Sequence, residues 1–169
     1  QEEHRYEAIF HALADEYTVA PDTGAFVGTS DDEAGLVIQP LNQQHMTVEV
    51  VSGQKEPVFQ GWVPGGGKYS VVPVPTPIYT AKATGPVTMA WIVQPLRPGQ
   101  SSPIRQCVTK AVENGEVSDI TFLDGTKYRL LLRHEGDAPV QAGGTTSTAS
   151  VALTEQRADG SQGNLILIE

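Results

Sequence analysis

The chain has 169 residues, which fits one domain with a hydrophobic core of its own that needs no disulfide or metal cross-link. Hydrophobic residues make up 39% and charged residues 18%, and the 17 glycines and 12 prolines favour short strands joined by turns over helices. The net charge of −9, with no Lys/Arg cluster, argues against a nucleic-acid-binding protein.

The first half of the chain alternates apolar and polar residues in short runs. In residues 4–12, Tyr6, Ala8 and Phe10 fall on one face, which predicts a half-buried strand. Turn-forming residues follow at 22–24 and 30–33. We expect further strands in this half at residues 35–39, 46–51, 68–72, 76–81 and 86–94.

Two of these expected strands carry additional signals. Pro73 and Pro75 separate residues 68–72 from 76–81, and because proline lacks a ladder donor, they mark a strand end or a sheet edge. Residues 86–94 are the most apolar strand, with Met89, Trp91 and Val93 on one face. We therefore expect Trp91 to be buried in the core.

The second half contains the clearest local signal, an Asp124-Gly125 pair between residues 117–123 and 126–132. This pair can supply both positive φ angles of a type I′ turn, so we predict an antiparallel hairpin. Residues 143–150 are rich in Gly, Thr and Ser, which predicts a loop within the same fold. Strands at 151–153 and 165–168, with a turn at Asp159-Gly160 between them, complete the chain.

Cys107 stands alone, so an intramolecular disulfide is excluded. Residues 105–109 alternate like a strand, and no His or cation pair that would activate a thiol lies nearby in sequence. A small core hydrophobe is the favoured interpretation over a reactive thiol.

These elements predict an all-β fold, a two-sheet antiparallel β-sandwich of about ten to twelve strands in a single domain over residues 1–169. No apolar stretch approaches the roughly 20 residues of a membrane span. No signal peptide is recognisable. The chain begins at Gln1, which suggests a processed product or an excised piece of a larger protein.

The best binding candidate is the segment of residues 61–69, with Trp62, Lys68 and Tyr69 around three glycines. Aromatic faces stack on the C–H surfaces of sugars, and glycines let a loop fold closely around a ligand, so these three residues are candidates for carbohydrate binding. It is not a phosphate-binding loop, because Tyr69 stands where Ser or Thr is required. The alternative is that Trp62 closes the end of the sandwich and residues 65–67 form a bend.

Other reactive groups do not form a recognisable catalytic, metal or cofactor site. His4 and His11 are about 23 Å apart in an extended strand, and their odd separation places them on opposite faces. The acidic run of residues 31–33 lacks the spacing of a calcium loop, which favours a solvated turn. Ser101 and Ser102 have no nucleophile-elbow motif around them.

Three stretches together carry a family resemblance. Residues 4–11 (His-Arg-Tyr-Glu-Ala-Ile-Phe-His) have an aromatic after the first His and an aromatic before the last. Gly61-Trp62 is followed at 73–79 by Pro-Val-Pro-Thr-Pro-Ile-Tyr, and residues 93–103 leave an apolar strand for a Pro/Gly turn. In order and spacing these stretches, which span about residues 1–133, resemble the C-terminal β-sandwich region of heparinase II/III-type polysaccharide lyases.

The resemblance implies a catalytic helical toroid upstream of this chain, whose Tyr and His residues abstract the proton α to a uronic acid carboxyl. None of those catalytic residues can be matched to a position here. The expected role is therefore a non-catalytic C-terminal accessory module of such a lyase, which packs on the catalytic part or contacts glycan. The resemblance also favours a secreted, periplasmic or cell-surface location.

Two other classes of function stay open from the sequence. One is a free-standing carbohydrate-binding or cell-surface adhesion module, which binding of glycans by the isolated chain would favour. The other is an enzyme in its own right, which turnover of a uronic-acid polymer would reveal.

Overall fold

The computed structural model describes residues 2–42, 46–85, 87–134, 136 and 138–168, and over these residues it contains sixteen strands and no helix. The predicted all-β fold is confirmed. By its internal contacts the chain divides into two compact units, residues 1–102 and 103–169. We describe each unit by itself.

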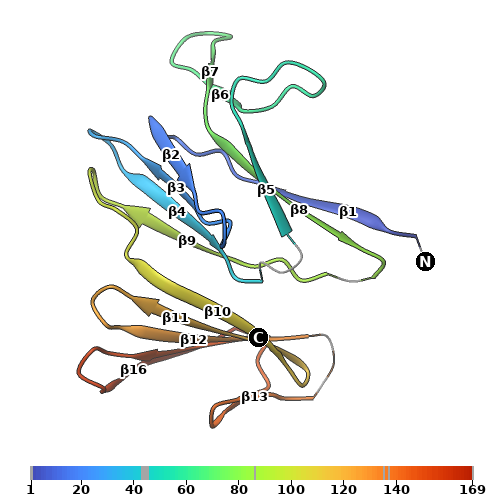
Figure 1. Cartoon of the computed structure of the whole chain (residues 1–169), viewed down its shortest axis with the longest axis vertical. Helices are drawn as coiled ribbons and strands as arrows, with labels where there is room; N and C mark the ends of the chain where they lie inside the picture. Colours follow the sequence, from blue (N-terminus) through green and yellow to red (C-terminus); the bar gives the residue numbers. More distant parts are fainter. Residues whose placement is uncertain (1, 43–45, 86, 135, 137, 169) are drawn as a thin grey trace. The chain divides into compact units, whose positions relative to one another are not determined.

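The first unit is built around two antiparallel sheets (Figure 1). One sheet has the order β1-β8-β5 and the other the order β2-β3-β4-β9. The first sheet comprises β1 (His4–Ile9), β5 (Met46–Val51) and β8 (Thr76–Ala83). The second comprises β2 (Glu16–Val19), β3 (Phe26–Thr29), β4 (Gly35–Pro40) and β9 (Trp91–Leu96). A short pair, β6 (Trp62–Pro64) and β7 (Val71–Pro73), extends from this unit.

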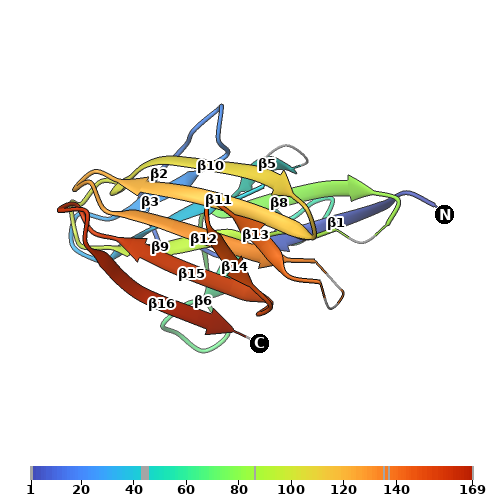
Figure 2. The same cartoon turned by 90° about the horizontal axis from the view of Figure 1, so that it is seen from below.

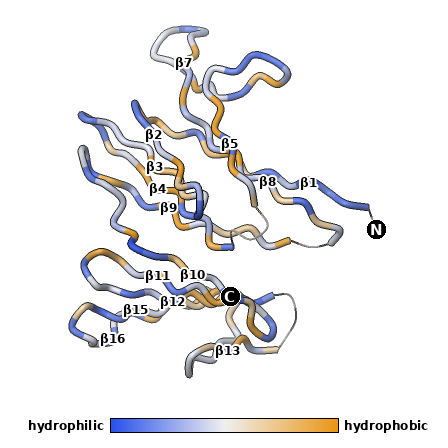
Figure 3. The backbone as a smooth tube through the Cα atoms, viewed as in Figure 1, coloured by the Kyte–Doolittle hydropathy of each residue, from blue (hydrophilic) through white to orange (hydrophobic). Residues whose placement is uncertain are grey.

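The core of the first unit lies between these two sheets and is organised by aromatic rings. Tyr79 of β8 makes edge-to-face contacts with Phe10 and Trp91, at centroid distances of 6.0 and 5.6 Å. The Tyr79 hydroxyl lies 3.0 Å from the carbonyl oxygen of Gly24 and 3.2 Å from that of Ile38, and burial raises its pKa. The hydrophobic residues of this core come from strands of both sheets, among them β4 and β5 (Figure 3).

The alternation predicted for residues 4–12 is confirmed, since Tyr6, Ala8 and Phe10 are half-buried while Arg5 and His11 are exposed.

The strand predicted over residues 86–94 differs from the observed one. The strand begins only at Trp91, and Pro86 lies outside the described residues. Trp91 is half-buried rather than buried, and Val93 is exposed, because β9 is the edge strand of its sheet.

The region around Pro73 and Pro75 also differs in part from expectation. The prolines do separate two strands, since β7 ends at Pro73 and β8 begins at Thr76. Residues 68–70, however, form a turn rather than the start of a strand, closed by a hydrogen bond from Ser70 N–H to Gly67 O of 3.1 Å.

The second unit contains a five-stranded antiparallel sheet in the order β10-β11-β12-β15-β16, which Figure 2 shows side by side. Its strands are β10 (Ile104–Val112), β11 (Gly115–Phe122), β12 (Lys127–Arg133), β15 (Val151–Gln156) and β16 (Gln162–Ile168). A hairpin of β13 (Val140–Ala142) and β14 (Thr145–Ser147) contributes Val140 to a small core with Val117, Leu131 and Ala152.

The hairpin predicted around Asp124-Gly125 is confirmed, but its turn type is not. Only Gly125 has a positive φ, of 89°, so the type I′ assignment is wrong. Gly125 N–H donates to Phe122 O (3.1 Å) and Phe122 N–H to Thr126 O (2.9 Å). This is the pattern of a three-residue connection that ends in a left-handed glycine. The expected turn at Asp159-Gly160 has the same pattern, with Gly160 N–H bonded to Arg157 O at 2.9 Å.

The two positive φ angles of a type I′ turn occur elsewhere, at Gly143 (54°) and Gly144 (82°) between β13 and β14. The sequence predicted a loop over residues 143–150, and the segment contains β14 instead. A Cβ built on Gly143 would overlap Nη1 of Arg129 on β12. Glycine is therefore favoured there by its φ angle, and any larger residue would also make the Arg129 side chain shift.

Candidate functional site

Two loops at one end of the first unit form the candidate site, namely residues 52–61 between β5 and β6 and residues 65–70 between β6 and β7 (Figure 1, top). Backbone hydrogen bonds close the first loop at its base, with Gly53 N–H to Gly61 O at 3.0 Å and a reciprocal pair between Gln54 and Gln60. A hydrogen bond of 2.8 Å from Gly65 N–H to Ser70 O closes the second. Both loops therefore have fixed bases from which their side chains project.

Trp62 opens β6 and is held in place on two sides. Its indole Nε1 donates to Gln54 O at 2.9 Å, and its ring stacks on Phe59 with a centroid distance of 5.5 Å and an interplanar angle of 9°. Trp62 is half-buried, whereas Phe59 is 62% exposed. The pair thus presents the Phe59 ring to solvent with the indole behind it.

Lys68 and Tyr69 lie together at the tip of the β6–β7 hairpin. Tyr69 has a φ of 61° and is 92% exposed, and the Lys68 Nζ atom lies 5.1 Å from the centre of its ring. A cation at this distance from a tyrosine face is attracted to the ring. Among the described ring contacts, none joins Tyr69 to Trp62, so the three predicted residues form two groups, Trp62 with Phe59 and Lys68 with Tyr69.

Phe59 was missed from the sequence. Its signal was available, because Val58-Phe59 is an apolar pair in an otherwise polar stretch three residues before Trp62. Both Val58 and Phe59 are exposed in the structure, so neither contributes to the hydrophobic core. Exposed apolar residues that lie together often mark a binding surface.

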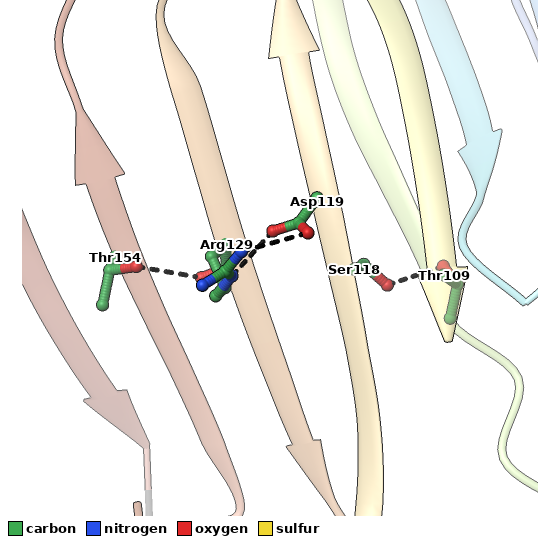
Figure 4. Close-up of polar contacts among 5 residues, drawn as sticks. All are labelled: Thr109, Ser118, Asp119, Arg129 and Thr154. Carbon is green, nitrogen blue, oxygen red and sulfur yellow. Dashed lines mark hydrogen bonds and ion pairs between the residues drawn. The ribbon is translucent and has the colours of Figure 1, made fainter. Parts of the chain in front are cut away.

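The second unit contains polar contacts between neighbouring strands that the sequence did not predict (Figure 4). Arg129 on β12 donates from Nε to Asp119 Oδ1 (2.7 Å) and from Nη2 to Asp119 Oδ2 (3.1 Å) on β11. This bidentate hydrogen bonding raises the pKa of Arg129. Thr154 on β15 approaches the Arg129 carbonyl oxygen. The Thr109 and Ser118 hydroxyls lie 2.7 Å apart on the opposite face of the sheet, because Ser118 directly precedes Asp119 in β11.

A shallow depression of about 440 Å³ lies over this ion pair, with Thr121, Lys127 and Gln156 in its lining. Both charges of the ion pair are already paired, and neither side chain is fully buried. The ion pair joins β11 to β12, and the depression over it is also lined by Tyr128 and Glu155.

The reactive residues considered from the sequence lie apart. His4 makes an edge-to-face contact with Tyr6 at 6.3 Å, while His11 and His134 are exposed and His45 lies outside the described residues. Residues 31–33 are exposed in a turn. Within the described ranges, no three His, Cys, Asp or Glu residues are grouped in a way that could hold a metal ion.

Comparison with known proteins finds no family model that matches this sequence and no curated protein that matches it. In the part of the chain that the structure describes, no helix is long and apolar enough to cross a membrane.

Proposed function

We propose that this chain is a non-catalytic β-module that contacts glycan through its two aromatic loops, as a C-terminal accessory part of a heparinase II/III-like polysaccharide lyase. The observation that carries the proposal is the stacked Phe59–Trp62 pair, held by a hydrogen bond at its base with the Phe59 ring 62% exposed.

The chemistry of this end of the unit supports a sugar ligand. A pyranose ring has flat C–H faces that pack on an aromatic ring, and its hydroxyls need hydrogen-bond partners at the rim. Tyr69 offers a second exposed ring with a phenolic hydroxyl, and Lys68 beside it offers an ammonium donor. A sugar chain that lay across both groups would have one apolar and one polar contact.

The accessory role rests on the resemblance of residues 4–11, 61–79 and 93–103 to the sandwich region of those lyases. The alternative is a free-standing carbohydrate-binding module, which uses the same loops. The two differ in what precedes the chain. A helical catalytic domain in the intact polypeptide supports the accessory role, and its absence supports the free-standing module.

Fluorescence titration tests glycan binding directly. In a Trp91→Phe background, Trp62 is the only remaining indole, so we expect neutral and acidic oligosaccharides that bind the loops to change its emission. Phe59→Ala should weaken binding about tenfold, because the loss of one aromatic stacking contact costs up to about 1.5 kcal/mol.

Tyr17→Ala is the matched control. Tyr17 is also an exposed ring stacked on another aromatic, Phe26, at 5.6 Å, but it lies on β2. This variant should bind oligosaccharides like the parent chain. Absence of binding across the whole panel, or equal affinity of the Phe59→Ala variant and the parent, would exclude these loops as a glycan site.

A further inference from the structure

The last strand of the second unit has an open edge. β16 (Gln162–Ile168) pairs with β15 on one side and is the terminal strand of the five-stranded sheet. A terminal strand presents backbone N–H and C=O groups along its outer side, ready to pair with another strand.

The side chains of β16 are unusually apolar for such an edge. Leu165, Ile166, Leu167 and Ile168 are 60, 50, 55 and 56% exposed. Leu165 and Leu167 stand opposite Thr154 and Ala152, whereas Ile166 and Ile168 stand opposite Leu153 and Val151. Since directly opposed residues share a face, the leucines extend one face of the sheet and the isoleucines the other. Aliphatic surface is therefore exposed on both sides of the strand.

The opposite edge of the same sheet is protected in the usual ways. β10 carries the exposed charges of Arg105 and Lys110, and its pairing with β11 is irregular between Ile104 and Gln106. Charges and bulges are devices that prevent an edge from pairing with another chain. β16 has no charged residue from Gln162 to Ile168. The pairing of β16 with β15 is also irregular, between Thr154 and Gln156, so the two edges differ in charge: β10 carries exposed charges and β16 carries none.

We propose that β16 is a dimerisation strand, which pairs in antiparallel fashion with β16 of a second copy of this chain. Two chains of net charge −9 repel each other, and an uncharged strand is a place where they can meet without opposing like charges. The inference is independent of the proposed glycan binding.

The strand is also complementary to itself. In a pair related by a twofold axis perpendicular to the sheet, the faces of the two copies match. With Ile166 opposite its own counterpart, Leu165 lies opposite Leu167 of the second copy. Leucine then packs against leucine and isoleucine against isoleucine. Because each chain has one uncharged edge in this sheet, assembly stops at two copies.

Sedimentation equilibrium of the full chain tests the proposal. We expect the average mass to rise from one chain to two as concentration increases. At high concentration, amide hydrogen exchange should slow in β16 and stay unchanged in β10. An average mass of one chain at every concentration, or an average mass above that of two chains, overturns the proposal. The hydrogen-exchange measurement uses the unmodified chain, so its result does not depend on whether a variant folds.

Charge variants at the twofold axis make the test specific. Ile166→Lys and Ile166→Glu should each remain monomeric, because like charges would stand opposite each other. An equimolar mixture of the two should form a dimer with one chain of each kind. Val108→Lys, which adds the same charge to the opposite edge strand, should dimerise like the parent chain. Dimers of Ile166→Lys alone, or a mixture that stays monomeric, contradict strand pairing at this position.

Discussion

Cys107 lies in the middle of β10, half-buried, where it stands opposite Ile120 of β11. The expectation of a small core residue is met in part, since the thiol is shielded but the residue is not fully buried. Burial raises the pKa of the thiol to about 11, with a smaller opposing effect from a hydrogen bond to Thr109. At neutral pH the group is therefore almost wholly protonated.

We expect Cys107 to react slowly with iodoacetamide. A pKa of about 11 leaves roughly a hundredth of the thiolate of an ordinary cysteine at pH 8, so alkylation should be on the order of a hundred times slower than in the urea-unfolded chain. The folded-state rate should rise with pH until about pH 11. A rate that levels off near pH 8 would show that the thiol is not desolvated in this way. Mass spectrometry of quenched samples measures both rates.

Arg129 illustrates how one residue can connect several elements. It binds Asp119 on β11 through its guanidinium, and Thr154 on β15 through its backbone carbonyl, and it lies against Gly143 of the β13–β14 turn. Because the ion pair is substantially exposed, its direct contribution to stability is modest. The same guanidinium lies where a Cβ on Gly143 would be, so the side chain couples the ion pair to the β13–β14 turn.

At the scale of the element, Gly143→Ala should be more destabilising than Gly144→Ala. Both positions have positive φ, so alanine at either one costs about 1 kcal/mol, but only a Cβ at Gly143 would overlap the Arg129 guanidinium and make that side chain move. Arg129→Ala should reduce the cost of Gly143→Ala and leave that of Gly144→Ala unchanged. Urea unfolding of the single and double variants measures this coupling. Purely additive effects would mean that the overlap is relieved elsewhere.

The turn of the β11–β12 hairpin gives a second prediction at this scale. Gly125→Val should destabilise the chain by about 1–3 kcal/mol, because a β-branched residue is strained at a φ of 89°. Gly66→Val is the control, since Gly66 lies outside the left-handed region with no atom near its built Cβ, and its cost should stay within about 0.5 kcal/mol. Equal melting temperatures for the two variants would refute the role given to Gly125.

For the whole molecule, we expect no eliminase activity on heparin, heparan sulfate, chondroitin or alginate. Such a reaction needs a proton acceptor, a proton donor and a charge stabiliser a few ångströms from one carbon. The described histidines are spread over the chain, with His4 at the start of β1, His11 beyond its end and His134 after β12. Ultraviolet absorbance of unsaturated products measures turnover. Activity that disappears with His4→Ala or His11→Ala would overturn the non-catalytic assignment.

The sequence alone determined the fold class, most of the strands in the first half of the chain and the β11–β12 hairpin. These features depend on residues close together in the chain, where alternation and turn-forming glycines act directly on the backbone. It also singled out Trp62, Lys68 and Tyr69 as candidates for carbohydrate binding, which stay a prediction, because aromatic residues beside glycines are visible as a local pattern.

The tertiary structure decided what depends on distant partners. Trp91 is half-buried because its strand became a sheet edge, and the Asp119–Arg129 pair exists because β11 and β12 align in a particular register. The exposure of Phe59, and of both faces of β16, follows from which neighbours each element lacks. Burial and edge position are properties of the assembled sheets, so no local pattern could have fixed them.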